Sequence, residues 1–174
     1  MKLLEDLERN CRNIVPCSAI IALLLWSTGM HSVIIMRGIT GSGKSTFVAK
    51  NFPGATVVSA DHFFEQAGGY AFDGTRLEDA HRACFKAFMD AIMRGDETIV
   101  VDNTNVESWE IAPYVAVAHA FSYQPEVITL LCEPGVAAAR GTHGVDAKKV
   151  AIRAGLLAKE RLPRSWKQRV VQTG

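Results

Sequence analysis

The stretch VIIMRGITGSGKSTFVAKNF, residues 33–52, decides the fold of this 174-residue chain. Residues 32–36 form an apolar run that predicts a short buried strand, and this run leads into a turn with three glycines. Residues 44–52 then predict a helix, which Pro53 and Gly54 end. A strand, a glycine-rich turn and a helix in this order indicate an α/β protein.

The turn GITGSGKS matches the pattern G-x-x-x-x-G-K-S between a strand and a helix. Glycines let backbone N–H groups close around a phosphate, and the N-terminus of the following helix favours an anion. Lys44 is expected to reach the terminal phosphates, and the Ser45 hydroxyl is expected to bind Mg²⁺. The sequence therefore predicts a site for ATP and Mg²⁺ formed by Gly38, Thr40, Gly41, Ser42, Gly43, Lys44, Ser45 and Thr46.

Strand and helix signals alternate along the rest of the chain. Strands are expected at 55–60, 97–102 and 126–133, and helices at 73–95, at 106–121 and in two pieces after residue 134. This alternation predicts an α/β protein with a mostly parallel sheet. Together with the phosphate loop it indicates the three-layer sandwich of P-loop NTPases, and the small residues around Arg140 predict a small helical lid near 134–146. The helix at 73–95 is expected to be capped by Asp73 or Thr75 and Gly95, with one apolar face made of Leu77, Ala80, Cys84, Phe88 and Ile92.

Ligands of parallel α/β sheets bind at the carboxyl ends of the strands, so polar residues there are candidates for the site. Asp61 follows the second strand and is expected to accept the proton of an attacking hydroxyl, or else to cap a helix. Asp102 ends the third strand and is expected to hold Mg²⁺ together with Ser45, or else to be a turn acid. Arg140 is expected to neutralise the transferred phosphoryl group from the lid, or else to be a surface arginine at a helix end.

Other polar residues near these strand ends are weaker candidates. Residues 103–105, Asn-Thr-Asn, are expected to position the acceptor. His62 lies beside Asp61 and is a candidate for contacting the acceptor, whereas His81 is expected to be packed or half-buried, and Pro113 is expected in the first turn of its helix or at a kink.

The sequence predicts two parts: residues 1–30 form a helical extension, and residues 31–174 form the domain that contains the phosphate loop and is expected to be a kinase. The strongly apolar part, residues 19–26, is far shorter than the ~20 residues needed to cross a bilayer. A weak membrane anchor, or an upstream extension with the natural start at Met30, remain alternatives. The four cysteines show no disulfide or zinc spacing, so we expect a cytoplasmic protein without stable membrane association.

Charge is distributed unevenly along the chain. Residues 1–139 carry 10 basic and 16 acidic residues, whereas residues 140–174 carry 9 basic and 2 acidic residues. The basic end favours a surface for nucleic acid, made of Lys148, Lys149, Arg153, Lys159, Arg161, Arg164, Lys167 and Arg169, or else a solvated basic helix.

The motifs in their order resemble the polynucleotide kinase branch of P-loop phosphotransferases, over roughly residues 32–170. The matching elements are SADHFF at 59–64, the helix start at 70–84, VDNTN at 101–105, RGTHGV at 140–145 and LPRSW at 162–166. The resemblance implies that Asp61 is a general base, that Arg140 is a lid arginine, and that the acceptor is a hydroxyl of nucleic acid.

One position departs from that pattern. The polynucleotide kinase pattern carries an arginine three residues after the base, where it grips the phosphate of the acceptor, and this chain has Phe64 there. The sequence is also similar to phage kinases that phosphorylate a hydroxymethyl-pyrimidine in DNA, such as 5-hydroxymethyluracil. For that acceptor, Phe63, Phe64, Tyr70 and Phe72 are candidate stacking surfaces, or else core residues.

Two other functions are compatible with these residues. A kinase for a small molecule or nucleoside needs the same phosphate loop, base and lid arginine. A regulatory ATPase needs the loop and Mg²⁺ alone, and would label no acceptor. The sequence leaves the acceptor and the oligomeric state open.

Overall fold

A computed structural model describes residues 31–66, 69–140 and 146–173. The expected helical extension at 1–30 and the part of the lid at 141–145 lie outside these residues. No helix within the described ranges is long and apolar enough to cross a membrane.

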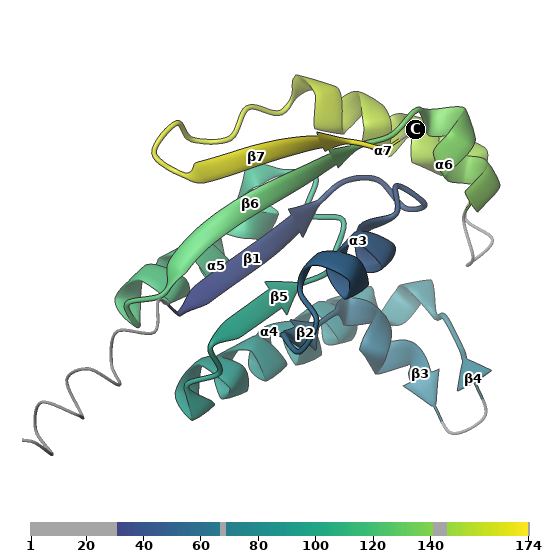
Figure 1. The fold of residues 1–174 in the computed structure, drawn as a ribbon. Coiled ribbons are helices and arrows are strands. Elements are labelled where there is room, and N and C mark those ends of the chain that lie inside the picture. The colour runs from purple at the N-terminus through teal and green to yellow at the C-terminus, as the bar shows by residue number, and fades with distance from the viewer. Residues whose placement is uncertain (1–30, 67–68, 141–145, 174) are drawn as a thin grey trace, which may run out of the picture. The chain divides into compact units, whose positions relative to one another are not determined.

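Five parallel strands form the main sheet, in the order β2-β5-β1-β6-β7. The strands are β1 (Ser32–Arg37), β2 (Thr56–Val58), β5 (Thr98–Val101), β6 (Gln124–Leu131) and β7 (Lys167–Gln172). Helices α3 (Lys44–Asn51), α4 (Leu77–Arg94), α5 (Ser108–Ala120), α6 (Pro134–Arg140) and α7 (Ala147–Lys159) connect them. The expected α/β sandwich is therefore confirmed (Figure 1).

Alternation of apolar residues in β1 places the core on both faces of the sheet. Val33 and Ile35 pack into one buried cluster with residues of α4 and α5, such as Phe88 and Ile111. Ile34 and Met36 point the other way and pack with α3, including Val48. A strand buried on both faces has to be apolar throughout, which is why residues 33–36 contain no polar side chain.

Several expected boundaries change in the structure. The segment 55–60 is extended only at Thr56–Val58, and the 3₁₀ helix η1 (Ala60–Phe64) follows it. The segment 73–95 begins with the 3₁₀ helix η2 (Gly74–Arg76), which Asp73 caps, before α4 starts. Gly95 ends α4 in a left-handed conformation with φ 77°, as expected.

Two expectations about single side chains are wrong, and a third is narrowed. Leu77 is 41% exposed, because α4 only begins there and its buried face starts one turn later. His81 is exposed rather than packed, because it lies on the solvent side of α4. Pro113 lies inside α5 and not in its first turn, which excludes one of the two places expected for it.

Two elements have no counterpart in the sequence prediction. A short antiparallel hairpin is formed by β3 (Glu65–Gln66) and β4 (Gly69–Tyr70), between η1 and η2. Strand β7 pairs in parallel with β6 at the edge of the sheet. Lys167 and Arg169 of β7 both form ion pairs with Glu126 of β6, at 2.9 and 3.1 Å.

Candidate active site

The phosphate loop joins β1 to α3 and requires glycine at two places where the chain packs closely. Gly41 has φ 80°, and a Cβ there would lie 1.9 Å from the carbonyl oxygen of Ala137 in α6. Gly38 has φ 154°, and a Cβ there would lie 2.7 Å from the carbonyl oxygen of Leu130. The loop is therefore wedged between the end of β6 and α6, and it is held in a form that only glycine permits.

Lys44 is buried at the first position of α3 and folds back over the loop. Its Nζ donates hydrogen bonds to the carbonyl oxygens of Gly38 (3.1 Å) and Ile39 (3.0 Å). Burial lowers the pKa of Lys44, and the negative charges of Asp102 and Asp61 partly oppose that shift. Both carboxylates therefore lie within electrostatic range of the ammonium group.

Ser45 and Asp102, the two residues expected to hold Mg²⁺, come together. Ser45 is exposed in the first turn of α3, and its side chain forms a hydrogen bond with the Asp102 carboxylate. Burial raises the pKa of Asp102, whereas the hydrogen bond from Ser45 and the charge of Lys44 lower it. Among the described residues, the Oδ1 atom of Asp102 is a buried oxygen without a hydrogen-bond partner. A carboxylate and a hydroxyl with an unsatisfied buried oxygen fit a hard cation such as Mg²⁺.

The other residues expected in the phosphate loop lie around Lys44. Thr40 and Gly43 are half-buried, and Thr46 is exposed beside Ser45. Ser42 is fully buried, and its carbonyl oxygen accepts a hydrogen bond of 2.9 Å from the hydroxyl of Thr173, just after β7. The end of the last strand thus braces the loop.

Asp61 lies on η1, directly after β2, and Ser59 connects it with Asp102. The Ser59 Oγ accepts a hydrogen bond from the backbone N–H of Asp61 (3.2 Å) and donates one to the carbonyl oxygen of Asp102 (2.9 Å). Ser59 was not among the expected site residues. The side chain of Asp61 is exposed, next to the exposed His62, and both charges influence the pKa of Asp102.

Asn103 and Asn105 are structural, which corrects the expectation that they position an acceptor. Asn103 is buried, accepts from the backbone N–H of Ala60 (2.8 Å) and donates to the Cys84 Sγ (3.3 Å). Asn105 is buried with φ 43°, and its Nδ2 donates to the carbonyl oxygen of Met36 (2.8 Å). The two amides therefore tie the end of β5 to the ends of β2 and β1.

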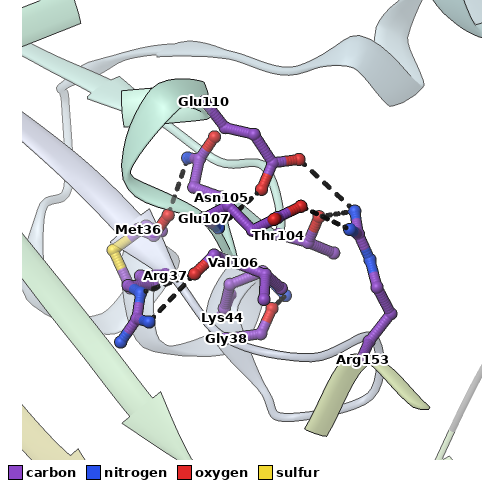
Figure 2. A network of polar contacts seen from close by, with 10 residues as sticks. All are labelled: Met36, Arg37, Gly38, Lys44, Thr104, Asn105, Val106, Glu107, Glu110 and Arg153. Carbon is purple, nitrogen blue, oxygen red and sulfur yellow. Dashed lines mark hydrogen bonds and ion pairs between the residues drawn. The ribbon is translucent and has the colours of Figure 1, made fainter. Parts of the chain in front are cut away.

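Thr104 connects the same loop to α7. Its carbonyl oxygen accepts from the backbone N–H of Gly38 (2.9 Å), and its hydroxyl contacts Arg153 Nη2 (3.5 Å). Figure 2 shows the guanidinium of Arg153 facing Thr104, Glu107 and Glu110, with Glu110 Oε1 at 3.3 Å and Glu107 Oε2 at 4.0 Å. Arg153 thus serves an internal network, which reduces its availability to a polyanion.

Arg37, the last residue of β1, is buried and was not expected in the site. Its Nε and Nη2 donate to the carbonyl oxygen of Val106 (3.2 and 2.9 Å), and Nη2 also contacts the carbonyl oxygen of Leu157 (3.3 Å). Burial lowers the pKa of Arg37, and the charges of Glu160 and Glu110 oppose this. Arg37 therefore joins the loop before α5 to α7, and Figure 2 shows its contact with Val106.

Arg140 is exposed at the C-terminal end of α6. It lies three residues after Ala137, whose carbonyl oxygen lies close to Gly41. This places the expected lid arginine on the helix that packs against the phosphate loop.

Phe64 is 3% exposed and packs in the core, so it offers no stacking surface for a base. Phe72 is 56% exposed and contacts Phe64 with ring centroids 5.1 Å apart. Phe63 is half-buried against Phe64. Of the expected stacking residues whose side chains the structure describes, Phe64 belongs to the core and Phe72 to the surface.

The fold and this site together define a P-loop kinase fold. A sugar kinase of Janibacter sp. HTCC2649 superimposes with a TM-score of 0.55 at 18% identity, over 82% of this chain and 86% of that one. A gluconokinase of Sinorhizobium meliloti 1021 superimposes with a TM-score of 0.52 at 16% identity, over 83% of this chain and 84% of that one. At these identities the likeness concerns the fold alone.

The family follows from the sequence comparisons. Residues 33–160 match the model of an AAA domain, and the chain belongs to that family. NEDD4-binding protein 2 of Homo sapiens is 32% identical over 127 residues, which are 68% of this chain but only 7% of that protein. An uncharacterized protein of Pasteurella multocida is 31% identical over 137 residues, which are 70% of this chain and 73% of that protein.

Proposed function

We propose that the protein transfers the γ-phosphate of ATP to a hydroxyl group of nucleic acid. The observation that carries the proposal is the meeting of Lys44, Ser45, Asp102 and Asp61 at the carboxyl edge of the sheet. A phosphate-binding lysine, a cation site and a separate exposed carboxylate are the parts that phosphoryl transfer to a hydroxyl requires.

Each residue has one role in this proposal. The loop backbone and Lys44 bind the β- and γ-phosphates, and Lys44 would exchange its bonds to Gly38 and Ile39 for phosphate oxygens. Ser45 and Asp102 would hold Mg²⁺, which when bound neutralises charge on the phosphates. Asp61 accepts the proton as the acceptor oxygen attacks, and Arg140 neutralises charge from α6.

The nucleic-acid acceptor is supported by the basic end of the chain and by the resemblance to polynucleotide kinases. Lys167 and Arg169 are engaged with Glu126, and Arg153 with Glu110. Among the residues that the structure describes, the other exposed basic side chains on and after α7 are Lys148, Lys149, Lys159, Arg161 and Arg164. The acceptor is either a 5′-hydroxyl end or a hydroxymethylated pyrimidine such as 5-hydroxymethyluracil. Phe64 supports neither one, since it is buried.

A small-molecule kinase is the second candidate, favoured by the sugar kinase and gluconokinase among the proteins of the same fold. The two candidates differ in salt dependence, because binding to nucleic acid releases counterions and weakens steeply as salt rises. A sugar or nucleoside acceptor would show little change.

The test uses γ-labelled ATP, Mg²⁺ and a panel of acceptors: 5′-hydroxyl DNA, 5′-hydroxyl RNA, duplex DNA with 5-hydroxymethyluracil, nucleosides and gluconate. Lys44→Ala is the inactive variant, and Lys50→Ala, exposed on the same helix, is its matched control. Label on a nucleic acid, lost in Lys44→Ala and retained in Lys50→Ala, is the expected result. Label on nucleosides or gluconate alone would mean that the acceptor is a small molecule and not nucleic acid. ATP consumption without any labelled acceptor would favour a regulatory ATPase.

A further inference from the structure

A pocket of about 300 Å³ is lined in part by η1. Its volume is at the small end of the range for ligand sites. It is large enough for a single ring system rather than a duplex. The lining residues come from η1 and from the segment before α4, and they are Phe63, Phe64, Ala71, Phe72, Asp73 and Arg76.

The pocket is linked to Asp61 through one short helix. Asp61, Phe63 and Phe64 all belong to η1, Ala60–Phe64, so the carboxylate and the pocket lining are two residues apart. Asp61 is also close enough to Lys44 and Asp102 to influence their pKa values. A ligand in the pocket would therefore contact the same short helix that carries Asp61.

Aromatic rings form the apolar part of the pocket. Phe64 is fixed in the core, and Phe72 leans against it with 56% of its own surface exposed. A large exposed aromatic side chain next to a hollow is a ready surface for a flat ring, and stacking of this kind accepts any base. The backbone N–H of Ala71 donates to the carbonyl oxygen of Phe64 (2.9 Å), which fixes the segment that carries Phe72 relative to η1.

The polar part of the pocket contains one cation and one anion. The Arg76 guanidinium lies over the Phe63 ring at 4.5 Å, and its Nε faces Asp79 at 3.5 Å. An arginine has five N–H donors, so this ion pair leaves donors for a ligand. Asp73 Oδ1 accepts from the backbone N–H and the hydroxyl of Thr75 (2.9 and 2.7 Å), which fixes the carboxylate at the rim.

These charges select the kind of ligand. Because Arg76 and Asp73 cancel, the pocket suits a neutral group better than a phosphate. A neutral flat ring whose edge carries both donors and acceptors matches the two side chains and the rings together. A nucleobase has this combination.

We propose that this pocket is the acceptor subsite, in which a nucleobase stacks on Phe72 with its edge between Arg76 and Asp73. The proposal deepens the proposed function and rests on it for the chemistry at Asp61. It assigns the recognition of the acceptor to the segment 72–76, and not to the position of Phe64.

The test measures base binding separately from transfer. A dinucleotide containing 2-aminopurine, with a 5′-hydroxyl, is titrated without ATP into the protein and into Phe72→Ala and Arg76→Ala. The matched controls are Phe121→Ala, a 45% exposed phenylalanine after α5, and Arg82→Ala, an exposed arginine on α4. The acceptor KM and the ATP KM are then measured for the same five proteins.

The expected result is a loss of dinucleotide affinity of at least about 5-fold in Phe72→Ala and Arg76→Ala. The controls should stay within about 2-fold of the unchanged protein. The acceptor KM should rise with the loss of affinity, while the ATP KM stays constant. Equal affinity in all five proteins, or an equal loss in the controls, would overturn the subsite.

The two proposals fail in different ways. If the protein transfers phosphate to nucleic acid and the acceptor KM is the same in Phe72→Ala and Arg76→Ala, the proposed function stands and the proposed subsite is wrong. Dinucleotide binding that depends on these residues, without transfer to any acceptor, would keep the subsite and remove the kinase. Transfer to a sugar, with no dinucleotide bound, would overturn the nucleobase as the ligand.

Discussion

The phosphate loop and the pocket beside η1 are built in opposite ways. On the phosphate side, Lys44, Asn103 and Asn105 are buried, and each is held by hydrogen bonds to neighbouring strand ends or to the loop. Around the pocket, Phe72 and Arg76 are exposed and are held by ring contacts and one ion pair. The residues around the phosphate loop are thus fixed by burial and hydrogen bonds, whereas the residues of the proposed acceptor subsite face solvent.

Removing the charge of Asp61 should have the largest effect, because the proposed transfer step depends on this carboxylate. Asp61→Asn is expected to lower kcat for transfer by about 10² to 10⁴-fold, since the acceptor hydroxyl loses its base. The ATP KM should remain within about 2-fold. The measurement is label transfer at saturating ATP, with Glu65→Gln as an exposed control nearby. An unchanged kcat would remove Asp61 from the mechanism.

Two glycine substitutions should separate close packing from backbone strain. Gly54 has φ 86° and open space where a Cβ would lie. The substitution Gly54→Ala should therefore cost about 1–2 kcal/mol of stability through backbone strain alone. Gly41→Ala has a similar φ but would press on the Ala137 carbonyl, which should cost about 1–3 kcal/mol more and weaken ATP binding. Urea unfolding and ATP titration measure both. An equal loss of stability in the two variants would mean that α6 moves away to make room for the new methyl group at residue 41.

Asn103→Ala should test whether the buried amide holds Asp61 in place. The backbone N–H of Ala60 would lose its acceptor, at a cost of about 1–3 kcal/mol. We also expect kcat to fall while ATP affinity is kept, because η1 would shift and the phosphate loop would not. Asn51→Ala, whose side-chain bond to the Phe47 carbonyl is exposed, is the control and should stay within about 0.5 kcal/mol. A fall in ATP affinity equal to that in kcat would contradict this division.

The smallest effect is expected at Asp96, which lies at the amino-terminal ends of strands β2 and β5, away from the candidate site. Hydrogen bonds from Arg94 and then Thr56 lower the pKa of Asp96 below its ordinary value of 3.8. A lowered pKa means that this carboxylate stabilises the fold at neutral pH and that its contribution is lost as pH falls through the folded pKa. Asp96→Asn should therefore cost less than about 1 kcal/mol at pH 7, and the difference should vanish in strong acid. Urea midpoints at several pH values measure this, and transfer activity should not change.

The phosphate side could largely be predicted from sequence, because its geometry is dictated locally. Glycines at fixed spacing and a following helix determine the loop within a few residues, and Asp102 lies at the end of an apolar strand. Strand β7 was missed for the opposite reason. Its sequence KQRVVQ lies at an exposed edge and lacks an apolar period, and its pairing depends on Glu126, some 40 residues earlier.

The contacts that complete the site were less accessible to sequence reasoning. Ser59 carried a signal, since a serine two residues before an aspartate is a frequent helix cap. The buried roles of Asn103 and Arg37 carried none, because their partners Ala60, Val106 and Leu157 are brought near only by the tertiary fold. The burial of Phe64 likewise depends on α4, which packs over η1.

The hydrogen bond from Thr173 to the Ser42 carbonyl has a consequence for the order in which the protein assembles. The two residues lie 131 positions apart, and the bond forms only when β7 has paired with β6. Contacts of such long sequence separation form late, because closing a long loop costs chain entropy before any contact compensates for it. On the ribosome, the glycine-rich turn emerges early but receives this brace only after Thr173 has been made. Competence to bind nucleotide should therefore appear only after β7 has been made and has paired with β6.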